Sequence, residues 1–246
     1  MMAEPKQLAA QDEQQRPGEP HYNQDGSTVG RLEAFSDGVF AIAITLLVLE
    51  IPTFLGHAPG KGSLLEQMAE EWPKYLMYVI SFIMIGIIWL NHHITFRYIQ
   101  RVNRPLLMLN VLLLMAISFI PHASAVLGDN FRVGHADDKQ TAAVLYTGTQ
   151  LLTAIFYFSL WTYAIRARLL NPSISGEQVR AMTRSYLFGP VFYTLTFILS
   201  FFSIEASLVF YALASLYFLI PAQWIASEQG QSATATGSAR GWRDGV

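Results

Sequence analysis

The sequence predicts an all-α polytopic membrane protein with six transmembrane helices per chain. Of the 246 residues, 52% are hydrophobic and only 14% are charged, which is too apolar for a soluble domain of this length. The chain also contains six apolar runs close to the ~20 residues that a helix needs to cross a bilayer. None of the runs alternates as a strand does, and in lipid a helix satisfies its own backbone groups.

The six runs follow one another along the chain with polar connections between them. Their approximate limits are 32–51, 72–91, 105–127, 141–165, 185–203 and 206–225. Only residues 203–206 separate the last two runs, so these could instead form one tight hairpin. The polar segment 1–29 and the segment 227–246, rich in Gly, Ser, Ala and Thr, have no hydrophobic periodicity. We expect both to be disordered tails around a membrane domain at 30–226.

The distribution of Lys and Arg predicts the orientation in the membrane, because cytoplasmic loops carry an excess of these residues. With the N-terminus inside, most of the 16 Lys and Arg residues fall on the cytoplasmic side. These are Lys6, Arg16, Arg31, Arg97, Arg101, Arg104, Arg166, Arg168, Arg180, Arg184, Arg240 and Arg243. Only Lys61, Lys74, Arg132 and Lys139 fall outside. The split predicts an even number of spans with both termini in the cytoplasm.

Many acidic residues fall on the opposite, outer side. They are Glu50, Glu66, Glu70, Glu71, Asp129, Asp137, Asp138 and Glu205. A negative potential at this side would attract cations. The alternative is that these carboxylates only keep the loops solvated.

Composition also narrows the class of function. The net charge of −2 provides no basic surface for a nucleic acid, and the absence of cysteine excludes disulfides and thiolate chemistry. An intramembrane metalloenzyme would have to be assembled from Asp37, His92, His93, His122 and Glu205. No two His residues have the i, i+4 spacing of H-E-x-x-H, and Glu205 belongs to the opposite face. We therefore expect neither enzyme activity nor a metal or other cofactor.

The first run, RLEAFSDGVFAIAITLLVLEI at 31–51, carries a stripe of residues on one helical face. Gly38, Ile42, Thr45 and Leu49 recur at spacings of four, three and four. Such a narrow stripe could be a packing seam between helices or could face a symmetry axis, and composition alone favours the seam. Asp37 projects away from the stripe. Because an ionisable side chain in a membrane is costly without a partner, Asp37 is a candidate site residue.

Polar residues of the second and third runs are expected at the depth of Asp37. The second run ends IIWLNHHITFRYIQR, and the third begins RPLLMLNVLLL. This placement predicts a buried hydrogen-bonded cluster of Ser36, Asp37, His93 and Asn110. The alternative is that the His pair is merely interfacial at a helix end. A proton channel or proton-coupled transporter, with Asp37 and the adjacent His92 and His93 as a relay, is the alternative function.

The pattern R-x-x-x-F-S-D followed by A-I-x-x-T-L-x-x-L-x-I closely resembles the first helix of the transmembrane protein 175 family, potassium-permeable channels of lysosomes and prokaryotes. In this sequence the pattern comprises Arg31, Phe35, Ser36, Asp37, Ala41, Ile42, Thr45, Leu46, Leu49 and Ile51. W-x-x-H-H at 89–93, R-x-x-R at 101–104 and L-N at 109–110 resemble the family's second and third helices. The motifs that resemble this family extend along the chain to about Pro121.

The resemblance implies a potassium-selective or potassium-preferring cation channel of the prokaryotic, single-repeat branch. It implies a homotetramer in the cell (inner) membrane, in which the first helix of each copy lines a central pore. Monovalent cations, with potassium as the permeant ion, and the lipid bilayer would be its partners. The T-V-G-Y-G carbonyl filter of ordinary potassium channels does not occur in the sequence.

The resemblance also implies residue roles. It assigns a hydrophobic constriction to Ile42, a selectivity-related hydroxyl to Thr45 and a further apolar ring to Leu49, which favours the symmetry axis over the packing seam. The remaining motif residues would form a structural cluster of Arg31, Phe35, Ser36, Asp37, Trp89, His93 and Asn110. In it, Ser36 and Asp37 would tie the cytoplasmic end of the first helix to the second and third helices and fix the rotation that aims Ile42 inward. For Arg31 two roles stay open, pairing with an acidic group and lining the inner entrance.

Overall fold

The computed structural model describes residues 25–52, 62–133 and 135–218, and in these residues it is helical, with short connections. This described part contains seven α-helices and one 3₁₀ turn. They are α2 (Asp25–Leu46), η1 (Leu47–Glu50), α3 (Leu64–Glu70), α4 (Trp72–Tyr98), α5 (Arg104–Val133), α6 (Ala136–Arg166), α7 (Gly176–Leu199) and α8 (Ile204–Phe218).

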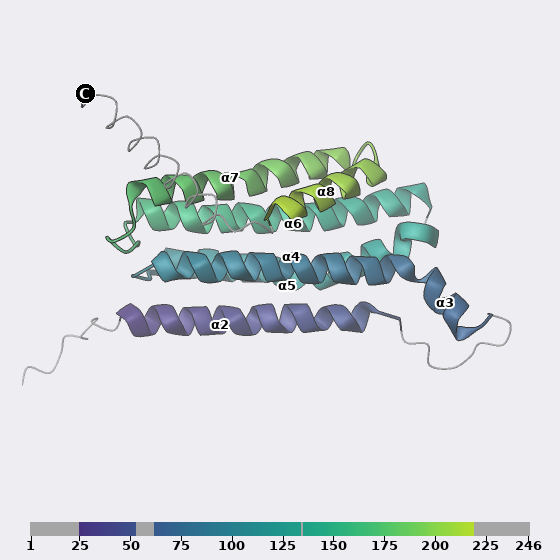
Figure 1. The fold of residues 1–246 in the computed structure, drawn as a ribbon, viewed down its shortest axis with the longest axis horizontal. Helices are drawn as coiled ribbons and strands as arrows, with labels where there is room; N and C mark the ends of the chain where they lie inside the picture. Colours follow the sequence, from purple (N-terminus) through teal and green to yellow (C-terminus); the bar gives the residue numbers. More distant parts are fainter. Residues whose placement is uncertain (1–24, 53–61, 134, 219–246) are drawn as a thin grey trace, which may run out of the picture.

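The long helices lie side by side in three layers (Figure 1). α2 forms one outer layer and packs on α4 and α5, which form the middle layer. α6 packs on α5, and α7 and α8 complete the third layer. Successive long helices run in opposite directions along the bundle. α2 is therefore supported by its own chain on one side.

Four helical segments in the described residues are long and apolar enough to cross a membrane. They are Thr28–Glu50, Trp72–Tyr98, Arg104–Phe131 and Ala136–Arg166. α7 has the length of a span but mixes Tyr, Thr, Ser and Arg with its apolar residues, and the apolar stretch of α8 is shorter, at Ile204–Leu213. The six predicted runs thus correspond to four clear spans and two further helices. Residues 219–225 of the sixth run lie outside the described residues.

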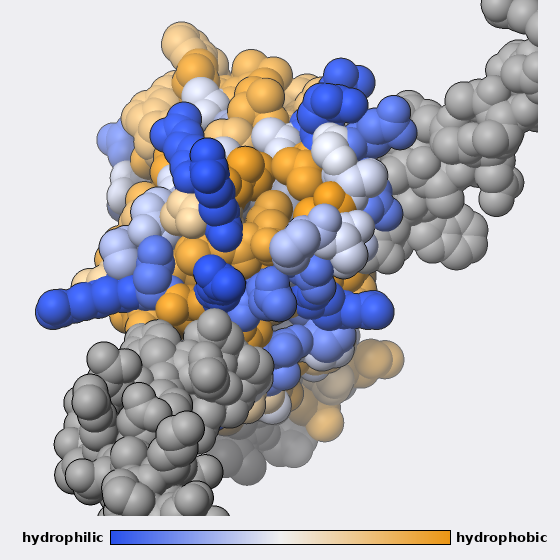
Figure 2. All heavy atoms as spheres, turned by 90° about the vertical axis from the view of Figure 1, so that its left-hand side faces the viewer, coloured by the Kyte–Doolittle hydropathy of each residue, from blue (hydrophilic) through white to orange (hydrophobic). Residues whose placement is uncertain are grey.

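The two ends of the bundle differ in charge. The basic end, where α2, α5 and α7 begin and α4 and α6 end, carries exposed arginines, and hydrophilic side chains gather on it (Figure 2). The arginines are Arg31, Arg97, Arg101, Arg104, Arg166, Arg168, Arg180 and Arg184. The opposite, acidic end carries Glu50, Glu71, Asp129 and Glu205. Lys74 at this end pairs with Glu71 at 3.1 Å and with Asp129 at 2.8 Å.

Two element boundaries differ from the sequence-based expectation. α2 begins at Asp25, inside the predicted tail 1–29, where Asp25 and Ser27 are residue types that favour a helix start. The rest of that tail, 1–24, and the predicted tail 227–246 lie outside the described residues. The short helix α3 was not predicted. It begins with a capping box in which the Ser63 hydroxyl accepts from the N–H of Glu66, whose carboxylate accepts from the N–H of Ser63.

The two connections at the basic end pair with each other. The N–H of Gln100 donates to the carbonyl of Leu169 at 2.8 Å, and the N–H of Asn171 donates to the carbonyl of Tyr98 at 2.8 Å. α6 ends just before the second of these connections, in a Schellman motif. In this motif the N–H of Leu169 donates to the carbonyl of Ala164 at 3.0 Å. This ending requires a left-handed residue, and Arg168 adopts it with φ of 56°.

Candidate functional site

α2 has one face that packs on its own chain and another that does not. Leu32, Ser36, Phe40, Ala43 and Leu47 are buried at spacings of four, four, three and four, and they face α4 and α5. Because successive residues turn by ~100°, Thr45 lies about 180° around the helix from Ser36, and Ile42 about 120°. The residues expected to line a pore therefore lie on the side of α2 that faces away from its own protomer.

The exposure of these residues agrees with that placement. Ile42 is 60% exposed, Leu49 is 73% exposed, and Thr45 is also exposed. A β-carbon built on Gly38, one turn before Ile42, would meet nothing within 4 Å. In lipid, small and hydroxyl side chains on a helix surface are typical of faces that approach other helices closely. This face of α2 is thus available for contact with further copies of the chain.

The hydroxyl of Thr45 has a defined orientation. It lies 3.0 Å from the carbonyl oxygen of Ala41 and 2.9 Å from that of Ile42, so its single proton is donated to its own helix. The oxygen keeps its acceptor capacity on the side away from the backbone. Thr45 can therefore offer lone pairs, and no proton, to a group that approaches this face.

The C-terminal end of the open face of α2 is tighter than an ideal helix. Residues 47–50 form the 3₁₀ turn η1, and the N–H of Ile51 donates to the carbonyl of Val48 at 3.2 Å. A 3₁₀ step turns by ~120° and rises ~2.0 Å, against ~100° and ~1.5 Å in an α-helix. Relative to a uniform helix, Leu49 is turned by roughly 60° and displaced by roughly 1.5 Å. Leu49 still lies on the same side of α2 as Ile42, but the stripe of Gly38, Ile42, Thr45 and Leu49 does not run straight along the helix.

A buried polar chain connects three helices on the opposite face of α2. Asn110 of α5 donates through Nδ2 to the hydroxyl oxygen of Ser36 at 2.9 Å, and Nε2 of His92 on α4 lies 2.9 Å from Oδ1 of Asn110. All three residues are fully buried. Ser36 donates its own proton to the carbonyl of Leu32 at 2.9 Å, so it can only accept from Asn110. This fixes the amide, and Nε2 of His92 must carry the proton that Asn110 accepts.

Two further contacts tie α2 to α4 beside this chain. The indole nitrogen of Trp89 donates to Oδ1 of Asp37 at 2.8 Å. Nδ1 of His93 lies 2.7 Å from Oε1 of Glu33, and the His93 ring stacks on the indole of Trp89 with centroids 6.1 Å apart. We call Ser36, Asn110, His92 and these two pairs the anchoring layer. It joins one face of α2 to α4 and α5.

The anchoring layer differs from the expected cluster in its pairing. Ser36 and Asn110 do meet, but His92 takes the place that was expected for His93, and Asp37 pairs with Trp89, which was not in the expected cluster. The periodicity of α4 contains a signal for this. His92 follows buried Ile85 by seven residues and precedes buried Phe96 by four, which puts it on the core face. Glu33, four residues before Asp37 on the same face, was not identified from the sequence.

The other candidate residues lie apart from this layer. Arg31 and Phe35 are exposed on α2 at the basic end. His122 lies against Phe119 on α5, with centroids 5.2 Å apart, and Glu205 accepts from the hydroxyl of Ser203 at 3.2 Å at the start of α8. Among residues 25–52, 62–133 and 135–218, no three His, Cys, Asp or Glu side chains gather as metal ligands would.

Fold and site together define a multi-pass α-helical membrane protein whose first helix is anchored on one face and open on the other. The model of the family of the endosomal/lysosomal potassium channel TMEM175 matches residues 31–121. A potassium channel of Streptomyces collinus is 40% identical over 190 residues, which are 77% of this chain and 90% of that protein. The chain belongs to the TMEM175 family.

Two further relatives show the range of the likeness. A crystal structure of a lysosomal potassium-selective channel TMEM175 homolog from Chamaesiphon minutus superposes with a TM-score of 0.72 at 37% identity, covering 80% of this chain and 98% of that one. The chicken (Gallus gallus) protein named endosomal/lysosomal proton channel TMEM175 is 37% identical over 144 residues, which are 55% of this chain but 28% of that protein.

Proposed function

We propose that the chain is the subunit of a potassium-selective cation channel in which the first helices of four copies surround a central pore. The observation that carries the proposal is the two-sided character of α2, anchored through Ser36 and open at Ile42 and Thr45. Family membership and the potassium-channel names of the bacterial relatives support it. The homotetramer and its position in the cell membrane are part of this proposal.

The pore would work by a hydrophobic constriction followed by a polar ring. Four Ile42 side chains around an axis would leave an opening in which a hydrated ion must lose water, or from which water withdraws. Thr45 lies almost one turn further along, and its hydroxyl oxygen presents lone pairs because the proton is donated to Ala41 or Ile42. Four such oxygens would offer partial compensation for the lost hydration. Leu49 would form a second apolar ring toward the acidic end.

The charge asymmetry supports the orientation with the basic end in the cytoplasm. Exposed arginines lie at that end, where hydrophilic side chains gather (Figure 2), as the positive-inside rule requires. Glu50 is exposed at the end of η1, so four copies would bring four carboxylates to the outer entrance. Glu71 and Asp129 are paired with Lys74 and would contribute less. In this orientation α7 and α8 complete six spans, with both termini inside.

A flux measurement tests the proposal. Liposomes that contain the purified protein and a potassium gradient should release potassium when a protonophore carries the compensating charge, and much less should flow with a sodium gradient. Ile42→Ala should increase the flux, because it widens the constriction. Ile155→Ala, at an exposed position on α6, is the matched control and should leave the flux unchanged. If intact tetramers of both the parent protein and Ile42→Ala fail to conduct, the proposal is wrong.

A proton channel is the second candidate function, and the name of the chicken relative favours it. The anchoring layer supports it less, because Asp37, His92 and His93 each bond a different residue rather than one another. In the same liposomes without the protonophore, a pH-sensitive dye inside measures proton entry through the protein. Proton flux that disappears in Asp37→Asn while potassium flux persists would favour this candidate with the relay in the anchoring layer.

A further inference from the structure

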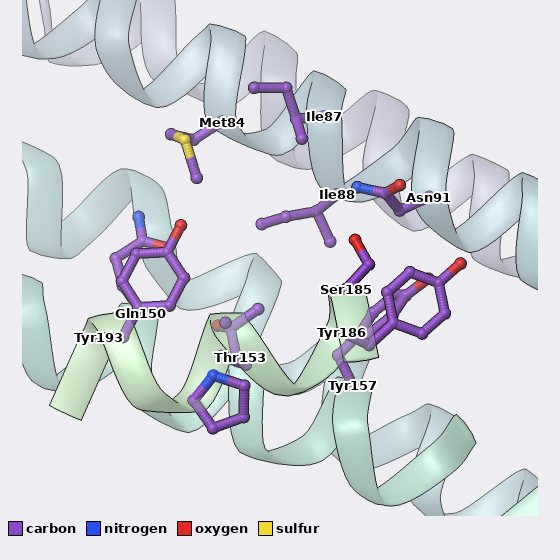
Figure 3. A pocket seen from close by; sticks show the side chains of 13 residues that line it. Met84, Ile87, Ile88, Asn91, Gln150, Thr153, Tyr157, Ser185, Tyr186 and Tyr193 are labelled. Carbon is purple, nitrogen blue, oxygen red and sulfur yellow. The ribbon is translucent and has the colours of Figure 1, made fainter. Parts of the chain in front are cut away.

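A cavity of about 60 Å³ lies inside the helix bundle, between the middle layer and the third layer. Residues of α4, α6 and α7 line it. Figure 3 shows Gln150 and Tyr193 toward one end of the cavity and Asn91 and Ser185 toward the other. Because α2 packs on the other side of the middle layer, the cavity is separate from the open face of α2.

The wall of the cavity mixes apolar side chains with amides and hydroxyls. Gln150 is 1% exposed, and its amide bonds the hydroxyl of Tyr146. An amide group has about four hydrogen-bonding positions, so this bond leaves it capacity for others. Thr153, also buried, donates its proton to the carbonyl of Thr149 at 2.9 Å, and its oxygen keeps lone pairs. Buried polar groups of this kind are normally matched by protein or by ordered water.

Two further polar side chains mark the opening of the cavity. Asn91 of α4 and Ser185 of α7 are partly exposed, and in the described part of the chain neither side chain has a hydrogen-bond partner. Arg184, directly before Ser185, is exposed, and so is His93, two residues beyond Asn91. A charged side chain that faces hydrocarbon is costly, so the level of Arg184 lies within reach of the polar interface. The opening is therefore close to the aqueous phase at the basic end.

We propose that this cavity is a water-filled crevice that opens at the basic end and brings water to Gln150, near the middle of the span formed by α6. A water molecule occupies ~30 Å³ in the liquid, so the cavity has room for about two. Water can donate to the hydroxyl oxygen of Thr153 and bond the amide of Gln150. An acyl chain of the bilayer, the alternative occupant, would leave these groups unmatched.

The crevice would thin the apolar barrier inside each subunit. Beyond Gln150, the hydroxyl of Tyr146 lies 3.2 Å from that of Ser81, which lies 2.9 Å from that of Ser124. Ser124 lines a second cavity, of about 10 Å³, together with Glu50 at the acidic end. Water at Gln150 would therefore be separated from that end by three hydroxyl groups rather than by a fully apolar layer. The inference concerns each subunit and does not rest on ion conduction.

The reactivity of single cysteines with silver ions tests the inference. The sequence contains no cysteine, so each variant carries one thiol. Thr153→Cys puts this thiol in the cavity wall, and Leu152→Cys puts it at the same depth on the exposed side of α6. Ag⁺ is small, is excluded from hydrocarbon, and replaces the thiol proton where water lets the thiolate form. The full chain in lipid nanodiscs is treated with silver nitrate in chloride-free buffer, and a maleimide then counts the remaining thiols after unfolding.

Thr153→Cys should react on the order of ten-fold faster than Leu152→Cys, because only the first thiol would contact water. Adding Ala154→Phe to Thr153→Cys places a ring in the cavity and should slow the reaction. Adding Ile155→Phe places the same ring on the exposed side of α6 and should not. Equal rates for the two thiols would overturn the proposal. So would an unchanged rate with Ala154→Phe, since silver would then reach the thiol by another route.

The parent protein offers a second measurement that needs no substitution. Pulsed X-ray radiolysis converts water into hydroxyl radicals, which oxidise a nearby methionine to its sulfoxide. Met84 lines the cavity and is 1% exposed, whereas Met182 is 4% exposed and is not among the lining residues. Mass spectrometry should find more sulfoxide at Met84 than at Met182. Equal oxidation of these two buried methionines would contradict a water-filled crevice, whether or not the cysteine variants fold.

Discussion

Replacing Asn110 by Leu should destabilise the protein through a defined set of lost contacts. Asn110 accepts from His92 at 2.9 Å and donates to Ser36 at 2.9 Å, and all three residues are fully buried. Leu has a similar volume but no polar atoms, so the two hydrogen bonds disappear without a large cavity. The Nε2–H of His92 is then left without an acceptor.

The expected loss in the free energy of unfolding follows from these lost contacts. An unmatched buried donor costs about 1–3 kcal/mol, and the bond to Ser36 contributes about 1 kcal/mol, since Ser36 keeps its contact with Leu32. Asn110→Leu should therefore lower the free energy of unfolding by about 2–4 kcal/mol. His92→Phe should be costly for the same reason, because it leaves the Asn110 carbonyl unmatched. The double variant leaves neither group unmatched and should recover about 1–2 kcal/mol relative to the sum.

Unfolding by denaturing detergent, followed by circular dichroism, measures these differences, and size-exclusion chromatography reports on the assembly. Asn130→Leu is the matched control, since within the described residues Asn130 bonds only the carbonyl of Val126 on its own helix, at 2.8 Å. A loss for Asn110→Leu no larger than that for Asn130→Leu would refute the role of the buried chain. Strict additivity in the double variant would refute the coupling between His92 and Asn110.

Three further changes test other parts of the structure. Thr45→Val removes the hydroxyl and keeps the shape, so reversal potentials should show a weaker potassium preference with conduction retained; an unchanged preference would assign selectivity to the apolar rings. Asp37→Asn weakens the charge-assisted bond from Trp89 and should cost about 1 kcal/mol in thermal stability, with ion preference intact; a stable protein with altered permeation would place Asp37 on the ion path. Arg168→Gly relieves the left-handed backbone and should stabilise by about 1 kcal/mol, while Arg166→Gly inside α6 should destabilise; if both act alike, the strain at Arg168 is negligible.

The two faces of α2 could be predicted from the sequence because they depend only on helical periodicity. The spacing of Gly38, Ile42 and Thr45 puts them on one side of any α-helix, whatever lies around it. The end of this helix was also signalled, since Pro52 disfavours a helical conformation at Ile51, which is extended with ψ of 129°. The 3₁₀ turn at 47–50 had no comparable signal.

For contacts between helices, the sequence predicts the depth in the membrane at which the polar residues lie, but not which of them bond each other. Antiparallel helices bring Ser36, Asn110 and the His pair to one layer, and the sequence suffices for that. Which of His92 and His93 enters the layer depends on the rotation of α4, because adjacent residues point ~100° apart. Core packing of Ile85 and Phe96 sets that rotation. The prediction of the number of spans has a similar limit. The polar residues of α7 lower its mean hydropathy, so a criterion based on hydropathy does not identify it clearly as a span.

The paired connections at the basic end constrain the order in which the chain can assemble. The bridge between Ile99 and Leu170 encloses both α5 and α6, so it closes a long loop at an entropic cost that grows with loop length. α5 and α6 pack on each other as an antiparallel pair, and their association brings the two connections together. We therefore expect the bridge to form after that pair has docked, as a late event in the maturation of the subunit.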